Sequence, residues 1–233
     1  MNAVETYEHD GVQVNIYYDE DGNEWNNPRN SECNLTTMVC WHPDYVLGDY
    51  QFKSPNERGA VETPYLETWK HDNTFASMEQ LGRYIGLAHK GICILPLYLY
   101  DHSGISISAG YNPMTFDSQG WDTTIVGFVY TTHERITELC GDGAEYHSDE
   151  WIIEQVRNDV KHYDSYLRGE CYGYIVDEDG PDEDSCWGYV GDIDYCKEEA
   201  NDMAEYVAKA RRSPDRIYVD AVPIEEHFAG MAS

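Results

Sequence analysis

The chain has 233 residues, and its 44 Asp and Glu against 15 Lys and Arg give a formal net charge of −29 at pH 7. A protein this acidic repels polyanions and anionic membranes, which excludes direct binding to a nucleic-acid backbone and leaves basic protein surfaces as its natural partners. The first residues lack the basic and apolar regions of a signal peptide, and no run of about 18 apolar residues occurs, so we expect a cytoplasmic protein outside the membrane.

Two strands are predicted in the first fifth of the chain. In Val12–Tyr18 apolar residues occupy every second position, which is the pattern of a strand with one buried face. Leu35–Trp41 is a short apolar run bounded by polar residues and predicts a second strand. The stretch 44–54 that follows has the composition of a loop.

A helix is predicted from Asn73, which can cap its N-terminus, to His89. Its apolar residues recur at steps of three and four, as they do on one face of an amphipathic helix. These residues are Phe75, Met78, Leu81, Ile85 and Ala88.

The clearest strand pattern begins at Ile92 and ends at Tyr100, and we expect it at the centre of the sheet. Leu95, Leu97 and Leu99 alternate there with Pro96, Tyr98 and Tyr100. One face of the strand is therefore aliphatic and the other mainly tyrosine. The residues Asp101–Gly104 favour a turn, after which Ile105 and Ile107 return antiparallel and Thr124–Tyr130 forms the next strand.

Helical patterns dominate the next part of the chain. Thr132–Leu139 is expected to add a helical turn or two. Ser148 then caps the longest helix, which Gly169 ends. Its apolar stripe consists of Ile152, Val156, Val160, Tyr163 and Leu167.

The C-terminal part is predicted to contain a hairpin, a helix and a last strand. Cys171–Val176 and Ser185–Val190 flank a charged loop and form the hairpin. The helix runs from about Asp194 to Arg211, with acids near its start and bases near its end, as the helix macrodipole favours. Residues 216–222 are expected to be a strand.

These elements predict an α+β fold in which about three helices pack on one face of a largely antiparallel sheet. We expect a single α+β domain over residues 1–233, with residues 1–10 and 223–233 as peripheral tails. The seven cysteines are irregularly spaced in a chain that is not small, so reduced thiols are expected.

The strongest compositional feature lies between Asp177 and Glu205, where twelve carboxylates against Lys197 give a charge of −11. Carboxylates held on a helix and a hairpin at phosphate-like spacing would imitate a nucleic acid and occupy the site of a DNA- or RNA-binding protein. A solvated acidic face, or adaptation of the whole surface to a salty cytoplasm, explains the same composition without a partner. The candidate binding residues are Asp177, Glu178, Asp179, Asp182, Glu183, Asp184, Asp192, Asp194, Glu198 and Glu199.

A metal-dependent hydrolase or nuclease is the alternative, because carboxylates at the ends of turns can bind a divalent cation that activates water. The residues for this site would be Asp101, His102, Asp117 and Asp122. Zinc binding by Cys33, Cys40 and His42 is disfavoured by the spacing of the cysteines and the lack of a fourth ligand. No cofactor is expected, and no phosphate-binding, nucleophile-elbow or zinc-protease motif occurs.

Several long strings resemble, in the same order, a family of acidic accessory proteins encoded by bacteriophages, prophages and other mobile elements. The strings are NLTTMVCWHPDYVLGD (34–49), ILPLYLYDHSGISIS (94–108), VGFVYTT (126–132), VKHYDSYLRGECYGYIV (160–176) and EDSCWGYVGD (183–192). The resemblance covers most of residues 11–200. Trp121 and Asp122 fit the family pattern and residues 123–125 depart from it. The family has no established activity, so the resemblance carries over no catalytic residue.

The resemblance implies an accessory protein that acts in the cytoplasm of a host cell. Acidic accessory proteins of this kind often block a host defence by imitating DNA, so the resemblance implies such a role by its class and not by particular residues. We therefore expect a non-enzymatic inhibitor of a restriction or CRISPR-type effector, with a basic nucleic-acid-binding protein of the host as its partner. The alternatives are the metal-dependent enzyme and a salt-adapted protein with no mimic role.

Overall fold

The structure is a computed structural model that describes residues 3–20, 24–42, 44–52, 91–110, 122–141 and 143–212. The predicted helix over 73–89, the predicted strand over 216–222 and Asp117 lie outside the described residues. The chain divides into two compact units. Unit 1 comprises residues 1–17, 173–187 and 193–233, and unit 2 comprises residues 18–172 and 188–192.

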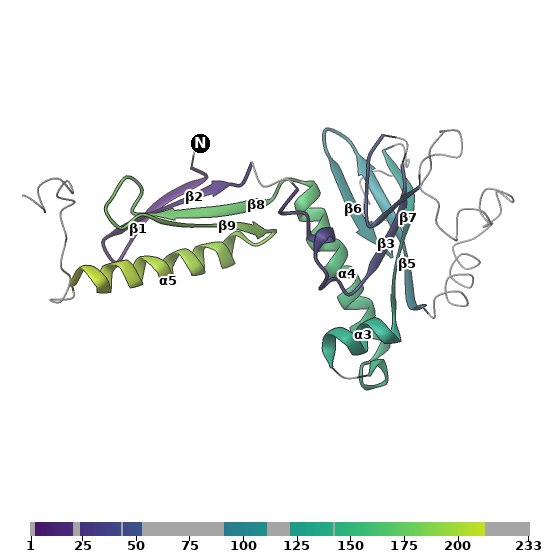
Figure 1. Ribbon diagram of the computed structural model, residues 1–233. Coiled ribbons are helices and arrows are strands. Elements are labelled where there is room, and N and C mark those ends of the chain that lie inside the picture. The colour runs from purple at the N-terminus through teal and green to yellow at the C-terminus, as the bar shows by residue number, and fades with distance from the viewer. Residues whose placement is uncertain are drawn as a thin grey trace, which may run out of the picture. The chain divides into compact units, whose positions relative to one another are not determined.

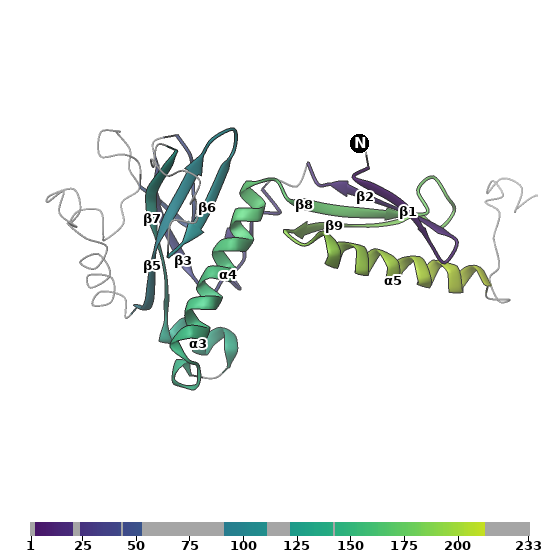
Figure 2. The ribbon, with the colours of Figure 1, turned by 180° about the vertical axis from the view of Figure 1, so that it is seen from behind.

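The predicted α+β class is confirmed, and nearly all strand pairs are antiparallel. The strands are divided between two sheets, whereas the sequence predicted one. Each sheet has a helix packed on one face, so the expected arrangement of helices on a single face holds within each unit (Figures 1 and 2). The single domain over 1–233 stays a prediction.

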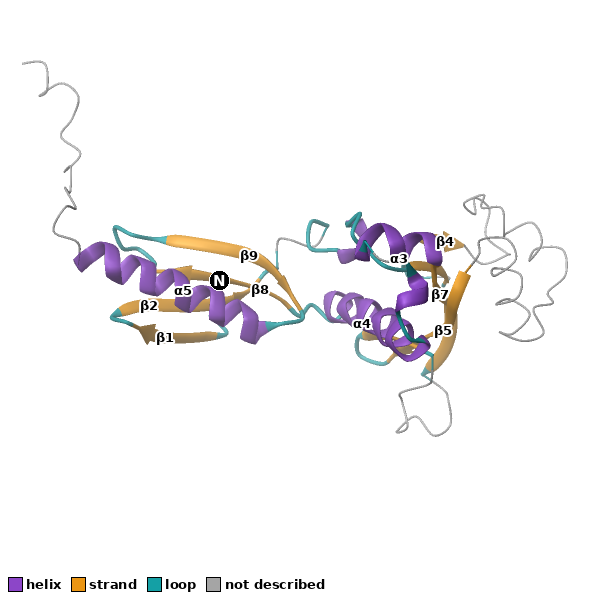
Figure 3. Ribbon diagram, turned by 90° about the horizontal axis from the view of Figure 1, so that it is seen from below, coloured by secondary structure: helices purple, strands orange, loops and turns teal. Residues whose placement is uncertain are grey.

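Unit 1 is built around a four-stranded sheet in the order β1-β2-β8-β9. Its elements are β1 (Glu5–His9), β2 (Val12–Tyr18), β8 (Cys171–Val176), β9 (Asp184–Val190) and the helix α5 (Ile193–Arg212). Figure 3 shows α5 lying along one face of this sheet. The buried stripe of α5 is made mainly of small residues, so the helix can approach the sheet closely. This stripe consists of Cys196, Ala200, Ala204, Val207 and Ala208.

Residues 5–9, expected to belong to a peripheral tail, form the edge strand β1 instead. The two-residue turn Asp10–Gly11 has positive φ at both positions, 51° and 80°, and this conformation matches the twist of an antiparallel hairpin. The hydroxyl of Tyr7 donates a hydrogen bond of 2.9 Å to Asn201 on α5, and Glu5 forms an ion pair with Lys197. These polar contacts hold β1 in place where apolar residues are few.

Unit 2 is built around a five-stranded sheet in the order β4-β3-β7-β5-β6. Its strands are β3 (Thr37–Trp41), β4 (Tyr50–Phe52), β5 (Gly91–Asp101), β6 (Ile105–Ala109) and β7 (Thr123–Thr132). Its helices are η1 (Pro28–Asn30), α3 (His133–Cys140), η2 (Ala144–Tyr146) and α4 (Asp149–Leu167). The short strand β4, which lies within the stretch predicted as a loop, pairs parallel with β3.

The core of unit 2 lies between α4 and the sheet. Leu97 and Leu99 are fully buried there, while Tyr98 and Tyr100 on the other face of β5 are partly exposed, as their alternation predicts. From α4 the residues Ile152, Val156, Val160 and Tyr163 enter this core. The side chain of Ser148 accepts a hydrogen bond from the amide of Trp151 and caps the helix at the predicted residue.

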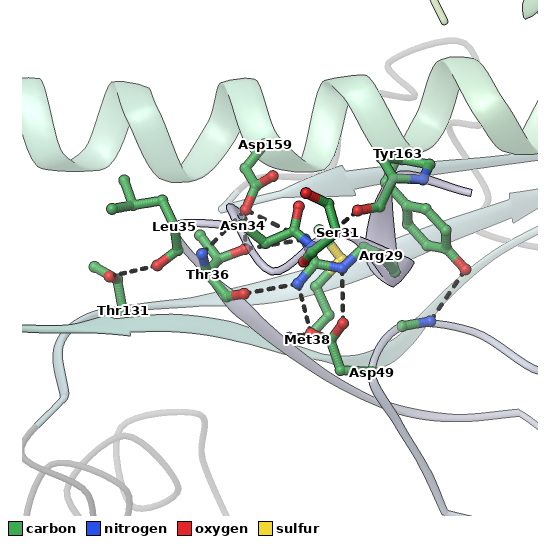
Figure 4. A network of polar contacts seen from close by, with 12 residues as sticks. Arg29, Ser31, Asn34, Leu35, Thr36, Met38, Asp49, Thr131, Asp159 and Tyr163 are labelled. Atoms are coloured by element: carbon green, nitrogen blue, oxygen red, sulfur yellow. Dashed lines mark hydrogen bonds and ion pairs between the residues drawn. The ribbon is translucent and has the colours of Figure 1, made fainter. Parts of the chain in front are cut away.

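A buried arginine crosslinks three parts of unit 2 (Figure 4). Arg29 in η1 has a side chain that is only 2 % exposed, and its guanidinium binds Asp49 through two nitrogens, at 2.9 and 2.5 Å. It also donates a hydrogen bond of 2.7 Å to the carbonyl of Thr36 and one of 3.2 Å to the carboxylate of Asp159 on α4. The same two carboxylates accept backbone amides of β3 and the residue before it, from Met38 and Thr36. Every acidic oxygen turned inward here has a partner, which a buried ionic group requires.

Replacing Arg29 with Leu is expected to lower the free energy of unfolding of unit 2 by about 3–5 kcal/mol, because Asp49 and Asp159 then lose their shared cation. Hydrogen exchange of the amides of α4 and β3 measures the loss. Arg168→Leu removes a half-exposed arginine and serves as the control, with an expected change of less than about 1 kcal/mol. Equal losses in the two variants would contradict the role given to Arg29.

Candidate functional site

The acidic loop between β8 and β9 turns two of its carboxylates toward α5. Asp177 and Asp182 both form ion pairs with Arg211, near the C-terminus of the helix, and the Asp182 pair measures 2.9 Å. Asp177 also accepts a hydrogen bond of 3.0 Å from the amide of Asp182. The Asp182 side chain is only 7 % exposed. Both carboxylates are therefore occupied inside unit 1 and are not free to imitate phosphate.

A third carboxylate, that of Glu178, is held by the sheet. It accepts a hydrogen bond of 2.5 Å from the hydroxyl of Tyr17 and another from the amide nitrogen of Asn15. Both residues lie on β2, where they alternate with the buried Val14 and Ile16. Burial and the neighbouring Glu178 carboxylate together raise the pKa of Tyr17 to about 12, so the hydroxyl remains a donor at neutral pH.

The other acids of the loop point outward. Asp179, Glu183 and Asp184 are exposed and form no ion pair with Lys or Arg among the described residues. Glu183 accepts the amide of Asp179 at 2.8 Å, and Asp184 accepts the amide of Ser185, so the loop orders them through its own backbone. Asp177 and Asp179 both adopt positive φ, 53° and 61°, which aspartate tolerates better than most residues.

Helix α5 carries a second set of exposed acids. Asp194, Glu198 and Asp202 follow one another at four-residue steps, which places them about 6 Å apart along the helix axis. The exposed rings of Tyr195 and Tyr206 lie on the same solvent-facing side. The predicted residue Glu199 is partly exposed and accepts a hydrogen bond from Tyr195, which is the first cause of the raised pKa of that tyrosine.

In the described ranges of unit 1, all four Lys and Arg side chains have partners within the unit. Lys197, Lys209 and Arg211 each pair with a carboxylate, and Arg212 donates to the carbonyl of Asp10. The fifty described residues of unit 1 contain fourteen Asp and Glu against four Lys and Arg, a charge of −10. The 106 described residues of unit 2 contain eighteen against five, a charge of −13, so the excess per residue is clearly greater in unit 1.

The ten predicted binding residues thus separate into three groups. Asp177, Glu178 and Asp182 are inner acids with partners in the fold. Six others belong to the solvent-facing loop and helix of unit 1: Asp179, Glu183, Asp184, Asp194, Glu198 and Glu199. Asp192 is exposed and belongs to unit 2. The exposed Asp202, which the prediction omitted, extends the stripe on α5 and shares its four-residue spacing.

The alternative metal site is brought together only in part. His102 and Asp122 lie 3.3 Å apart, while the carboxylate of Asp101 accepts the hydroxyl of Tyr45 at 3.0 Å. Asp117 lies outside the described residues. Within the ranges that the structure describes, no group of three or more His, Cys, Asp or Glu is placed to hold a metal ion.

The three residues weighed for zinc binding differ in their surroundings. Cys40 is fully buried in β3, where desolvation raises the pKa of its thiol to about 12, so it stays a poor metal ligand. Cys33 is exposed. His42 uses its Nδ1 to accept the amides of Asp44 and Tyr45. Local structure therefore accounts for Cys40 and His42 without a metal.

Comparisons with known proteins assign no family to the chain. No family model matches it, and neither a curated protein nor a solved structure matches it. None of the helices in the described part of the chain combines the length and apolar character needed to cross a membrane.

Replacing Glu178 with Ala is expected to destabilise unit 1 by about 1–3 kcal/mol, because Tyr17 and Asn15 lose a charged acceptor in buried surroundings. Glu183→Ala, in the same loop, is expected to change the stability by less than about 0.5 kcal/mol. Hydrogen exchange of the amides of β2 and β8 compares the two variants. Similar losses would show that inner and outer acids are not distinct.

Proposed function

We propose that the chain is a non-enzymatic inhibitor that occupies the basic site of a nucleic-acid-binding protein. It does so with the outer acids of unit 1, which are the exposed Asp179, Glu183, Asp184, Asp194, Glu198 and Asp202. One observation supports this proposal most strongly. The described Lys and Arg side chains of unit 1 are engaged within the fold, while a set of exposed carboxylates forms no ion pair with Lys or Arg among the same residues. Basic groups of a partner would supply the missing counter-charges.

A surface that imitates DNA needs the acids of the loop as well as those of α5. One strand of duplex DNA presents a phosphate about every 3.4 Å of axis, whereas the stripe on α5 presents a carboxylate about every 6 Å. The helix alone is therefore roughly half as dense as one DNA strand. The loop acids Asp179, Glu183 and Asp184 add to it on the same unit, and Arg211 ties this loop to the end of α5.

Exposed tyrosines give the stripe a second property of nucleic acids. Tyr195 and Tyr206 are 50 % and 69 % exposed and stand among the acids of α5. An aromatic face beside an anion suits arginine, whose guanidinium stacks on rings while it binds carboxylates. The long-range attraction of the charge on unit 1 would speed the encounter with a basic groove.

The context of the proposal comes from the resemblance to accessory proteins of mobile elements. In that context the partner would be a restriction or CRISPR-type effector in the cytoplasm of a host cell, whose nucleic-acid site is basic by necessity. The acidic surface would compete with the nucleic acid for this site. Nothing in such a role requires a catalytic residue.

Reversing the outer acids to Lys should abolish capture of DNA-binding proteins from a bacterial lysate. The variant has the six substitutions D179K, E183K, D184K, D194K, E198K and D202K. The wild-type chain is expected to release the captured protein on addition of duplex DNA, and to bind it at least about tenfold more weakly at 200 mM than at 50 mM salt. Retention of the partner by the variant would refute the proposal.

A matched control separates the surface from the net charge. It reverses six exposed acids of unit 2 and therefore changes the total charge equally: Glu32, Asp44, Glu134, Glu138, Glu150 and Glu154. This control is expected to keep most of the binding. Equal loss in both variants, or a wild-type chain that captures nothing and folds only in molar salt, would favour the salt-adapted alternative instead.

A further inference from the structure

A groove of about 600 Å³ in unit 2 runs along the first half of β5. One wall is formed by the four successive residues Ile92–Leu95. Because side chains alternate between the two faces of a strand, a hollow that touches four residues in a row follows the edge of the strand. The opposite wall comes from η2 and the start of α4, including Glu145, Asp149 and Ile152. Its volume lies within the usual range of ligand sites, about 300–1,000 Å³.

Along this groove the outer edge of β5 pairs with no strand in the part of the chain that the structure describes. On one side β5 pairs with β7 from Gly91 to Tyr100. On the other side its pairing with β6 begins only at Leu97, and one further hydrogen bond joins the amide of Gly110 to the carbonyl of Pro96. No described strand pairs with Ile92–Leu95 on that side. An edge of this kind can accept an extended peptide as an additional strand.

The walls of the groove carry negative charge above an apolar floor. Glu145 and Asp149 are exposed, and no Lys or Arg is among the residues that line the groove. Arg157 is a cation close to it: its guanidinium lies beside Gly110 and Leu95 and acts electrostatically on Cys93. Leu95 and Ile152 supply apolar surface, and the nearly buried thiol of Cys93 has a pKa raised first by burial, so it acts as a neutral, apolar group.

We propose that the groove binds an extended peptide segment of a partner protein, with Lys or Arg placed among aliphatic residues. The peptide backbone pairs with the edge of β5, its aliphatic side chains contact Leu95 and Ile152, and a basic side chain lies between Glu145 and Asp149. Charge complementarity selects a basic peptide, and a strand edge that no described strand covers selects an extended one. This site belongs to unit 2 and does not depend on the acidic surface of unit 1.

The test uses the full-length chain and a capped, fluorescein-labelled peptide of sequence Lys-Val-Lys-Val-Lys-Val. Anisotropy measures its binding at low salt, and hydrogen exchange locates it. The peptide is expected to slow the exchange of amides within Ile92–Leu95. The same peptide with Glu in place of Lys should not bind, and one methylated on its backbone nitrogens should bind much more weakly, because it cannot donate to a strand.

Two double variants with the same change of net charge distinguish the groove from general attraction to an acidic protein. E145K/D149K alters the groove and should weaken binding on the order of tenfold. E150K/E154K alters exposed acids of α4 outside the groove and should weaken it much less. Circular dichroism confirms that both variants are folded.

Several results would overturn the proposal. These are no binding of the lysine peptide at millimolar concentration, equal weakening by the two double variants, or no protection of Ile92–Leu95. Unchanged binding of the methylated peptide would exclude strand addition. A peptide-free dimer that E145K/D149K alone dissociates would assign the groove to a second copy of the chain instead.

Discussion

Arg211 lies between Asp177 and Asp182, and this pairing decides how the most acidic segment of the chain can fold. Two carboxylates in one short loop repel each other, and the repulsion grows when water is excluded around them. A guanidinium that binds both offsets the repulsion and fixes the loop to the end of α5. Three acids of the loop are then held inward, and the remaining acids must face the solvent.

The same device recurs in unit 2, where Arg29 binds Asp49 and Asp159. A chain with so few cations uses these two arginines as crosslinks, each of which binds two carboxylates from other elements of its unit. Arginine suits this use because its planar donor groups bind two carboxylates at once. The surplus of acids therefore remains on the surface, where it can be solvated or can bind a cationic partner. The fold thus separates structural from exposed charge, and the proposed function concerns only the exposed part.

The bounds of several strands and helices were predicted correctly from the spacing of their apolar residues and from the turns that flank them. The strand Val12–Tyr18 is β2 with the same bounds, and the helix expected after Ser148 is α4, which ends at Leu167 just before Gly169. The hairpin and α5 also agree within one or two residues. In α4 and α5 burial of a single face imposes the period that the sequence displays, whereas β9 is largely exposed.

Features that depend on polar contacts between distant segments did not follow from the sequence. Strand β1 has no apolar alternation and was not predicted, although the Asp10–Gly11 pair is a hairpin signal from which it could have been predicted. From the sequence, ten acids were predicted to form one binding surface. Only tertiary contacts with Arg211, Tyr17 and Asn15 distinguish the inner acids from the outer ones, and composition does not reveal these contacts. The groove beside β5 likewise depends on where the pairing with β6 begins, which no local pattern specifies.

Carboxyl footprinting tests the central claim, the division of the acidic loop into inner and outer acids, most directly. The folded chain is treated with a carbodiimide and glycine ethyl ester, and mass spectrometry follows the modification of each residue. Asp179, Glu183 and Asp184 are expected to react much faster than Asp177, Glu178 and Asp182, and to become protected when a basic partner binds. Equal rates for the two sets in the free protein would contradict the account.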